Sequence, residues 1–227
     1  LTALVWPVLA PRHELPAPGA AAAGNSAGGS GHGAGEITLL TLAYGLAGFG
    51  YIITATFLPV IARQSLPGSP WLDMFWPIFG LGVIGGALVA SRMRTRLDLR
   101  LLLAICYAIQ ALGIGVGLYS PSLAGFAFGS LLLGLPFTAI TFFAMQEVRR
   151  IRPQAPAALM GLLTALYGLG QIVGPPLAAA MLARAATPAA GFTLSLEIAA
   201  AALVLGALLF GAMARLWPVR PATPGQA

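Results

Sequence analysis

The sequence predicts an all-α fold, a polytopic transmembrane helical bundle, and three observations support this. Hydrophobic residues make up 58% of the chain and charged residues only 8%, whereas an ordinary soluble domain carries about a quarter charged residues. The mean hydropathy is +0.88. Between Ile37 and Trp217 the apolar residues form continuous runs, not the alternation expected of β-barrel strands. So few charges cannot cover a water-soluble surface, and the runs are predicted to cross a bilayer.

The first 35 residues divide into two segments. Residues 1–10, LTALVWPVLA, are apolar over about half a membrane span, and we interpret them as the end of a truncated transmembrane helix. No basic stretch precedes them, which argues against a signal peptide. Residues 11–35 are rich in Pro, Ala, Gly and Ser, a composition typical of a flexible linker. A six-helix transmembrane domain is expected at 36–217 and a cytoplasmic tail at 218–227.

Six apolar segments are long enough to cross the bilayer. A helix needs roughly 20 residues to span a hydrocarbon core of about 30 Å. Gly and Pro recur inside the segments, and membrane helices tolerate them because neighbouring helices satisfy the freed backbone groups. The predicted spans are Ile37–Ala62, Trp71–Arg92, Leu99–Tyr119, Ser122–Val148, Ala155–Leu182 and Phe192–Leu216.

The arginines predict the orientation of the bundle. All twelve basic residues are arginine, and only Arg63 and Arg184 fall on the side away from the other ten. The positive-inside rule then places the arginine-rich side, with the linker and the C-terminus, in the cytoplasm. We expect a multi-pass protein of the bacterial inner (cell) membrane. The net charge of +6 therefore indicates topology and not nucleic-acid binding.

The sequence offers no group suited to catalysis or metal binding. Cys106 is the single cysteine and lies in an apolar run, where we expect it to be inert packing. His13 and His32 share a Gly/Pro-rich loop with no third ligand nearby, which argues against a metal site. No phosphate-binding loop or paired carboxylate is present. We predict that the chain is not an enzyme and needs no cofactor.

Polar side chains deep in a bilayer are costly and usually face the bundle interior or a watery cavity. Three of the predicted spans present such side chains at intervals of three and four residues or just after Pro136, a predicted kink. The alternative is that these groups bond to neighbouring helices or lie at the membrane interfaces. The candidate substrate-cavity residues are Tyr44, Tyr51, Thr138, Thr141, Thr164, Tyr167 and Gln171.

Glycines and prolines cluster in the fifth predicted span, in the sequence YGLGQIVGPP. Such a helix is thin and lets a neighbouring backbone approach closely. The cluster predicts either a hinge used during transport or a packing seam. The residues concerned are Gly168, Gly170, Gly174 and Pro175, with Gly48 on the first span.

The acidic residues lie near the ends of the predicted spans, and none is at a helix centre. On the side away from most arginines we expect two ion pairs, Asp73 with Arg63 and Glu197 with Arg184. Proton-coupled carriers generally need an intramembrane acid or histidine. If transport uses a coupling proton, the titrating group is expected in a half that this chain lacks, with Glu147 and Glu197 as local alternatives.

Two sequence segments resemble a known family. LAYGLAGFGYIITATFLPVIAR, from Leu42 to Arg63, and LMGLLTALYGLGQIVGPPLAA, from Leu159 to Ala179, are similar to the seventh and eleventh helices of the YbfB/YjiJ family of major facilitator superfamily transporters. The resemblance implies the C-terminal six-helix half of that fold, whose halves are joined by a linker. It also implies that the first, fourth and fifth predicted spans line a central substrate cavity.

The superfamily's loop signature, Gly-x-x-x-Asp-Arg-x-Gly-Arg-Arg, has a degenerate counterpart in GALVASRMRTR, from Gly86 to Arg96. Ala or Ser replaces the Asp, and no Gly divides the arginines. A charge-relay role is therefore not predicted for this loop. Arg92, Arg94 and Arg96 remain as topology determinants with a gating contact.

Taken together, these patterns predict the C-terminal half of a secondary active transporter of a small solute, working by alternating access against a missing N-terminal half in the lipid bilayer. The neutral, aromatic cavity residues favour an uncharged organic solute. Two alternatives are a six-helix chain that pairs with itself and a noncatalytic membrane scaffold or assembly subunit. A scaffold would have its interior faces sealed by apolar packing.

Overall fold

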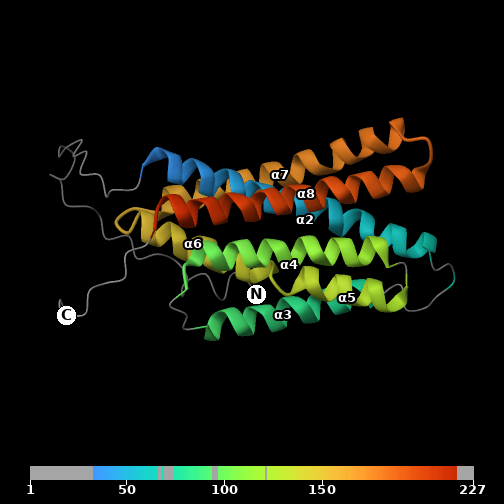
Figure 1. Ribbon diagram of the computed structural model, residues 1–227, viewed down its shortest axis with the longest axis horizontal. Helices are drawn as coiled ribbons and strands as arrows, with labels where there is room; N and C mark the ends of the chain where they lie inside the picture. The colour runs from blue at the N-terminus through green and yellow to red at the C-terminus, as the bar shows by residue number, and fades with distance from the viewer. Residues whose placement is uncertain (1–32, 66–67, 69–73, 94–96, 121, 219–227) are drawn as a thin grey trace, which may run out of the picture. The chain divides into compact units, whose positions relative to one another are not determined.

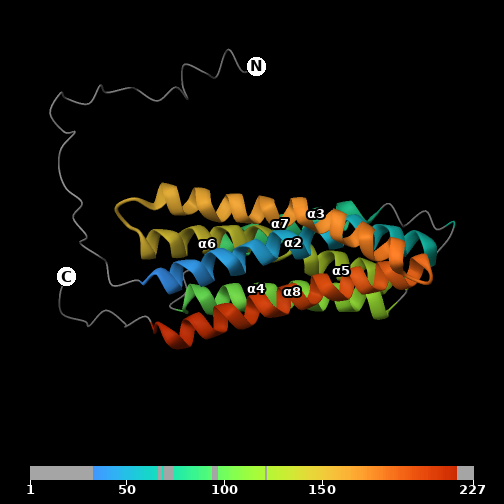
Figure 2. The same ribbon diagram turned by 90° about the horizontal axis from the view of Figure 1, so that it is seen from above.

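The computed structural model describes residues 33–65, 68, 74–93, 97–120 and 122–218, and over these residues the chain is helical with no β-strand. The helices run side by side in one bundle (Figures 1 and 2). The predicted stub at 1–10, most of the predicted linker and most of the tail lie outside the described residues. The helices are α2 Ala34–Ser65, α3 Phe75–Arg92, α4 Leu99–Tyr119, α5 Leu123–Gly134, α6 Phe137–Ile151, α7 Pro156–Arg184 and α8 Pro188–Leu216.

The predicted all-α membrane bundle is confirmed. Six helical spans in the described residues are long and apolar enough to cross a membrane, with α5 and α6 together forming the fourth. Large apolar side chains cover the outside, for example Ile172 at 70% and Leu208 at 65% exposure. An exterior of this kind suits hydrocarbon better than water, because apolar area exposed to water carries a free-energy cost.

Helix starts follow ordinary capping chemistry. The Asp98 and Ser122 side chains accept backbone hydrogen bonds at the starts of α4 and α5. Helix α8 starts at Pro188, one turn before the predicted Phe192. The Thr187 hydroxyl caps this helix, and a proline in the first turn loses no hydrogen bond there. The predicted start at Phe192 missed this Thr-Pro signal.

At the predicted kink, the regular helix is interrupted for two residues, Leu135 and Pro136, between α5 and α6, while both residues keep right-handed helical backbone angles. Proline has no N–H to donate to the carbonyl four residues earlier. At the break the buried Gln110 of α4 donates from its Nε2 atom to the Leu133 carbonyl at 3.2 Å. A side chain from a neighbouring helix thereby satisfies a carbonyl beside the break, as a water-free interior requires.

Helix α2 packs against both α7 and α8. Helix α4 packs against α8, α5 and α6, and α3 lies against α5. Helix α7 is the least buried of the six spans. One wall of the bundle, formed largely by α7, is therefore left uncovered by the other described helices.

Glycines allow α2 and α7 to approach closely. A Cβ atom at Gly48 would collide with the Tyr167 carbonyl, and one at Gly174 would meet a methyl group of Ile52 at 2.6 Å. Gly170 faces the Gly45 carbonyl in the same way. Backbone contact of this kind is the usual function of small residues between membrane helices.

The glycine contact predicts a position-specific effect of alanine. Gly48→Ala should lower the free energy of unfolding by about 1–3 kcal/mol, because the methyl group overpacks a backbone contact. Gly168 is the matched control, since nothing lies within 4 Å of a Cβ built there. Gly168→Ala should be neutral or slightly stabilising in a detergent unfolding titration. Equal effects of the two variants would contradict the close α2–α7 contact.

Candidate functional site

Three predicted cavity residues from three helices meet at one place. Tyr44 of α2 donates a hydrogen bond to the Thr141 hydroxyl of α6 at 3.2 Å. The ring of Tyr167, on α7, lies 5.2 Å from the Tyr44 ring between centroids. Tyr44 is buried, Tyr167 is half-buried and Thr141 is exposed in the described bundle. The cluster therefore runs from the interior to an open face.

A second aromatic group extends this cluster along α2. The ring of Tyr51 lies 4.7 Å from Phe137 and 6.1 Å from Phe79. Beside it, Thr138 donates to the Val83 carbonyl of α3 at 3.4 Å. We call the set Tyr44, Tyr51, Thr141 and Tyr167 the aromatic wall, and none of its members is charged.

The remaining predicted cavity residues, Thr164 and Gln171, form no hydrogen bond with this cluster in the described bundle. Thr164 is exposed, and its hydroxyl donates to the Met160 carbonyl one turn earlier on the same helix. Gln171 is half-buried. Helix α7 continues through Pro175 without interruption. Gly170 and Gly174 belong to the close contact with α2, whereas Gly168 borders open space.

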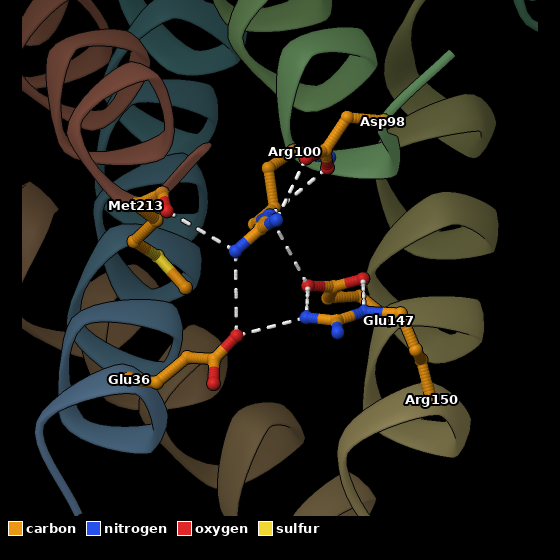
Figure 3. A network of polar contacts seen from close by, with 6 residues as sticks. All are labelled: Glu36, Asp98, Arg100, Glu147, Arg150 and Met213. Carbon is orange, nitrogen blue, oxygen red and sulfur yellow. Dashed lines mark hydrogen bonds and ion pairs between the residues drawn. The ribbon is translucent and has the colours of Figure 1, made fainter. Parts of the chain in front are cut away.

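A buried network of charged side chains lies at the arginine-rich end of the bundle (Figure 3). Arg100 of α4 is fully buried at its centre. Its guanidinium lies 3.4 Å from Glu36 of α2 and 3.6 Å from Glu147 of α6, and it donates to the Met213 carbonyl of α8 at 3.1 Å. One side chain thus links the ends of four helices.

Two further residues complete the ion network. Asp98, which caps α4, contacts the Arg100 guanidinium at 2.7 Å. Arg150 forms a fork with Glu147, at 2.9 and 2.7 Å, and also reaches Glu36 at 2.8 Å. Paired, doubly hydrogen-bonded contacts of this kind are the strong form of the guanidinium–carboxylate interaction. We call Glu36, Asp98, Arg100, Glu147 and Arg150 the ion network.

Asp98 remains ionised in this setting. Its burial raises the pKa of the carboxyl, but the side-chain and backbone hydrogen bonds from Arg100 act in the opposite direction, as do the charges of Arg100 and Arg150. The net result is a pKa below the usual value for aspartate. An ionised Asp98 keeps a negative charge beside Arg100 at neutral pH.

Sequence reasoning treated Arg100 and Arg150 only as topology determinants and missed the ion network. The spacing of Glu147 and Arg150, three residues apart on one helix face, is a signal that could have predicted that pair. Glu36 and Arg100 are 64 residues apart in the chain, so no local pattern connects them.

Two other predictions about charges had different outcomes. The predicted Glu197–Arg184 ion pair is wrong: these two described residues form no ion pair, and Glu197 instead accepts a hydrogen bond from the Tyr119 hydroxyl at 2.8 Å. This hydrogen bond joins α8 to the end of α4. The two residues are 78 positions apart in the chain, so no local sequence pattern connects them. Asp73 lies outside the described residues, as do Arg94 and Arg96, so those predictions remain untested. Arg92, the last residue of α3, is exposed.

Comparison with known families identifies the chain. Residues 1–211 match the model of the family described as "Uncharacterised MFS-type transporter YbfB", where MFS is the major facilitator superfamily. The chain belongs to this family. It is therefore a membrane transporter protein of the YbfB type, and the resemblance stated from its sequence is confirmed. Neither the curated proteins nor the solved structures include a match to this YbfB-type chain.

The ion network predicts a large penalty for removing its centre. Arg100→Met should lower the free energy of unfolding by about 3–5 kcal/mol, because the three carboxylates of the ion network then face a single arginine, Arg150. Arg149→Met is the matched control, because Arg149 is exposed on α6. This variant should change the free energy of unfolding by no more than about 0.5 kcal/mol. Both are measured by titrating the purified protein with sodium dodecyl sulfate in mixed micelles. If Arg100→Met lowers the free energy of unfolding no more than Arg149→Met does, Arg100 does not take part in the ion network.

Proposed function

We propose that this YbfB-type protein moves a small, uncharged organic solute across the membrane by alternating access, with the aromatic wall forming one side of the substrate cavity. The observation that carries the proposal is the meeting of Tyr44, Thr141 and Tyr167 from α2, α6 and α7. Rings with hydroxyl groups suit a ligand that is mainly apolar with a few hydrogen-bonding groups.

The lack of charge in the wall supports an uncharged solute. The described members of the aromatic wall and their ring partners Phe79 and Phe137 carry no formal charge. An ionic solute in a dry cavity needs a paired charge to replace its hydration. The acids and arginines of the ion network are already engaged with one another at the end of the bundle.

The exposed face of α7 supports packing of this half against a second domain. The proposed partner is a second six-helix half against which this half rocks, as in carriers built from two repeats. Thr141 and Thr164 are exposed in the described bundle although both lie within predicted spans. Hydroxyls at such positions are suited to a water-filled cavity between two halves and less to lipid.

The same proposal assigns the orientation and the coupling. The arginine-rich end, which holds the ion network, faces the cytoplasm of a bacterial cell with the linker and C-terminus. A coupling proton, if one is used, is assigned to the second half, and Glu147 is engaged with Arg100 and Arg150 in the ion network. The wall and the packing of the helices then provide binding and motion, without a cofactor.

Cysteine accessibility tests the proposed cavity. In a Cys106→Ala background, Thr141→Cys and Tyr167→Cys should react with a membrane-impermeant thiosulfonate reagent, because they line a water-filled space. Ile105→Cys and Leu208→Cys, both at exposed apolar positions, should not react, because lipid covers them. The assay is run on the protein in its native membrane.

Protection of all four cysteines would contradict the cavity and favour a scaffold whose interior is sealed. Reaction of all four would mean that water reaches the outside of the bundle, which contradicts the membrane placement.

A further inference from the structure

A cavity separate from the aromatic wall lies at the end of the bundle opposite the ion network. It sits between the last turns of α2 and the first turns of α3 and α5, and its volume is about 310 Å³. Side chains from all three helices line it, including Ala62, Phe75, Ile78, Phe126, Ala127 and Ser130.

The lining is apolar. Its one hydroxyl, that of Ser130, donates to the Phe126 carbonyl on its own helix at 2.6 Å, and Ser130 is fully buried. No charged side chain is among the described lining residues. A charged or strongly polar ligand would lose its hydration here without replacement. A small aromatic molecule loses little hydration on entering an apolar cavity, and such cavities in proteins bind molecules of this kind.

The size of the cavity limits the ligand. Small-molecule sites usually have volumes of about 300–1,000 Å³, and this cavity of about 310 Å³ is at the lower end. That space suits a compact solute of one or two rings. Phe75 and Phe126, both nearly buried, present aromatic surface to it.

Aromatic side chains connect this cavity to the aromatic wall. Phe75 lines the cavity and stacks on Phe79, with ring centroids 6.3 Å apart. Phe79 in turn lies 6.1 Å from Tyr51 and 5.7 Å from Phe137. A small void between them is lined by Tyr51, Phe75 and Phe79 among others. These contacts form a continuous row of packed aromatic rings from the cavity to Tyr51.

We propose that this cavity is an outer binding site for a small uncharged aromatic solute, on the path between the membrane surface and the aromatic wall. The inference rests on the proposed transport function and assigns the class of its substrate. A solute that enters here exchanges one apolar surface for another as it passes Phe75 and Phe79. No step requires a charge in the cavity.

Filling the cavity tests the proposal. The probe is naphthalene, and its saturable binding to the purified protein in lipid nanodiscs is measured by equilibrium dialysis against empty nanodiscs. Ala127→Phe places a ring in the cavity and should weaken binding at least about tenfold, a loss easily resolved in a dissociation constant. Ala124→Phe is the matched control, one turn away on α5 and exposed, and should bind as the unaltered protein does.

A second variant guards against a folding defect. Ala62→Leu fills the cavity from α2 and should also weaken naphthalene binding, while thermal unfolding shows that each variant is folded. Absence of saturable binding in the unaltered protein, or equal binding in Ala127→Phe and Ala124→Phe, would overturn the proposal. Displacement of bound naphthalene by added phospholipid acyl chains would also overturn it, because a lipid tail would then be the occupant.

The binding assay separates this inference from the proposed function. If naphthalene does not bind but Thr141→Cys and Tyr167→Cys react as expected, the outer site fails and the central cavity stands. If naphthalene binds to the unaltered protein and binds weakly to Ala127→Phe, while those cysteines are protected, the outer site is real and the central cavity fails.

Discussion

The arrangement of this bundle depends on the high free-energy cost of burying a charged side chain without a neighbouring opposite charge. Arg100 is fully buried, and the groups around it come from four helices: Glu36 on α2, Glu147 on α6 and the Met213 carbonyl on α8, with Asp98 at the start of its own helix. Breaking such a pair is costly even where forming it gains little. The ion network therefore fixes how the ends of these helices meet, and hydrophobic burial cannot do so, because the surrounding lipid is as apolar as the core.

Away from the ion network, backbone contact and aromatic packing replace charge. Gly48 and Gly174 bring α2 against α7 closely enough for Tyr167 to reach Tyr44. The break at Pro136 ends α5, and beyond it α6 begins and carries Thr141 to the same place. The membrane transporter assigned by family membership thus has a charged end and a neutral, aromatic middle. The uncharged solute that we propose suits that middle, because the described members of the aromatic wall carry no charge to replace the hydration of an ion.

The fold could be predicted from the sequence to a large extent, and the site only in part. Apolar segment length and the arginine pattern identify six spans, because each membrane helix must satisfy its own backbone hydrogen bonds and present an apolar surface to the lipid. Pro136 indicated its break for an equally local reason. Tyr44, Thr141 and Tyr167 could be nominated as polar groups within spans, but their meeting depends on packing. Of the ion network, only the Glu147–Arg150 pair could have been predicted from its spacing, because Glu36 and Arg100 come together only after α2 and α4 have packed. The Glu197–Tyr119 contact escaped prediction for the same reason.

A double-mutant cycle between Arg100 and Glu147 tests the central claim most directly. Unfolding free energies are measured for the unaltered protein, Arg100→Met, Glu147→Gln and the double variant in mixed micelles. Because the two side chains face each other at 3.6 Å in a buried site, the double variant should lose less than the sum of the single losses. The expected coupling is about 1–3 kcal/mol. Additive losses, with a coupling below about 0.5 kcal/mol, would show that the two residues act independently and would contradict a network that holds the helix ends together.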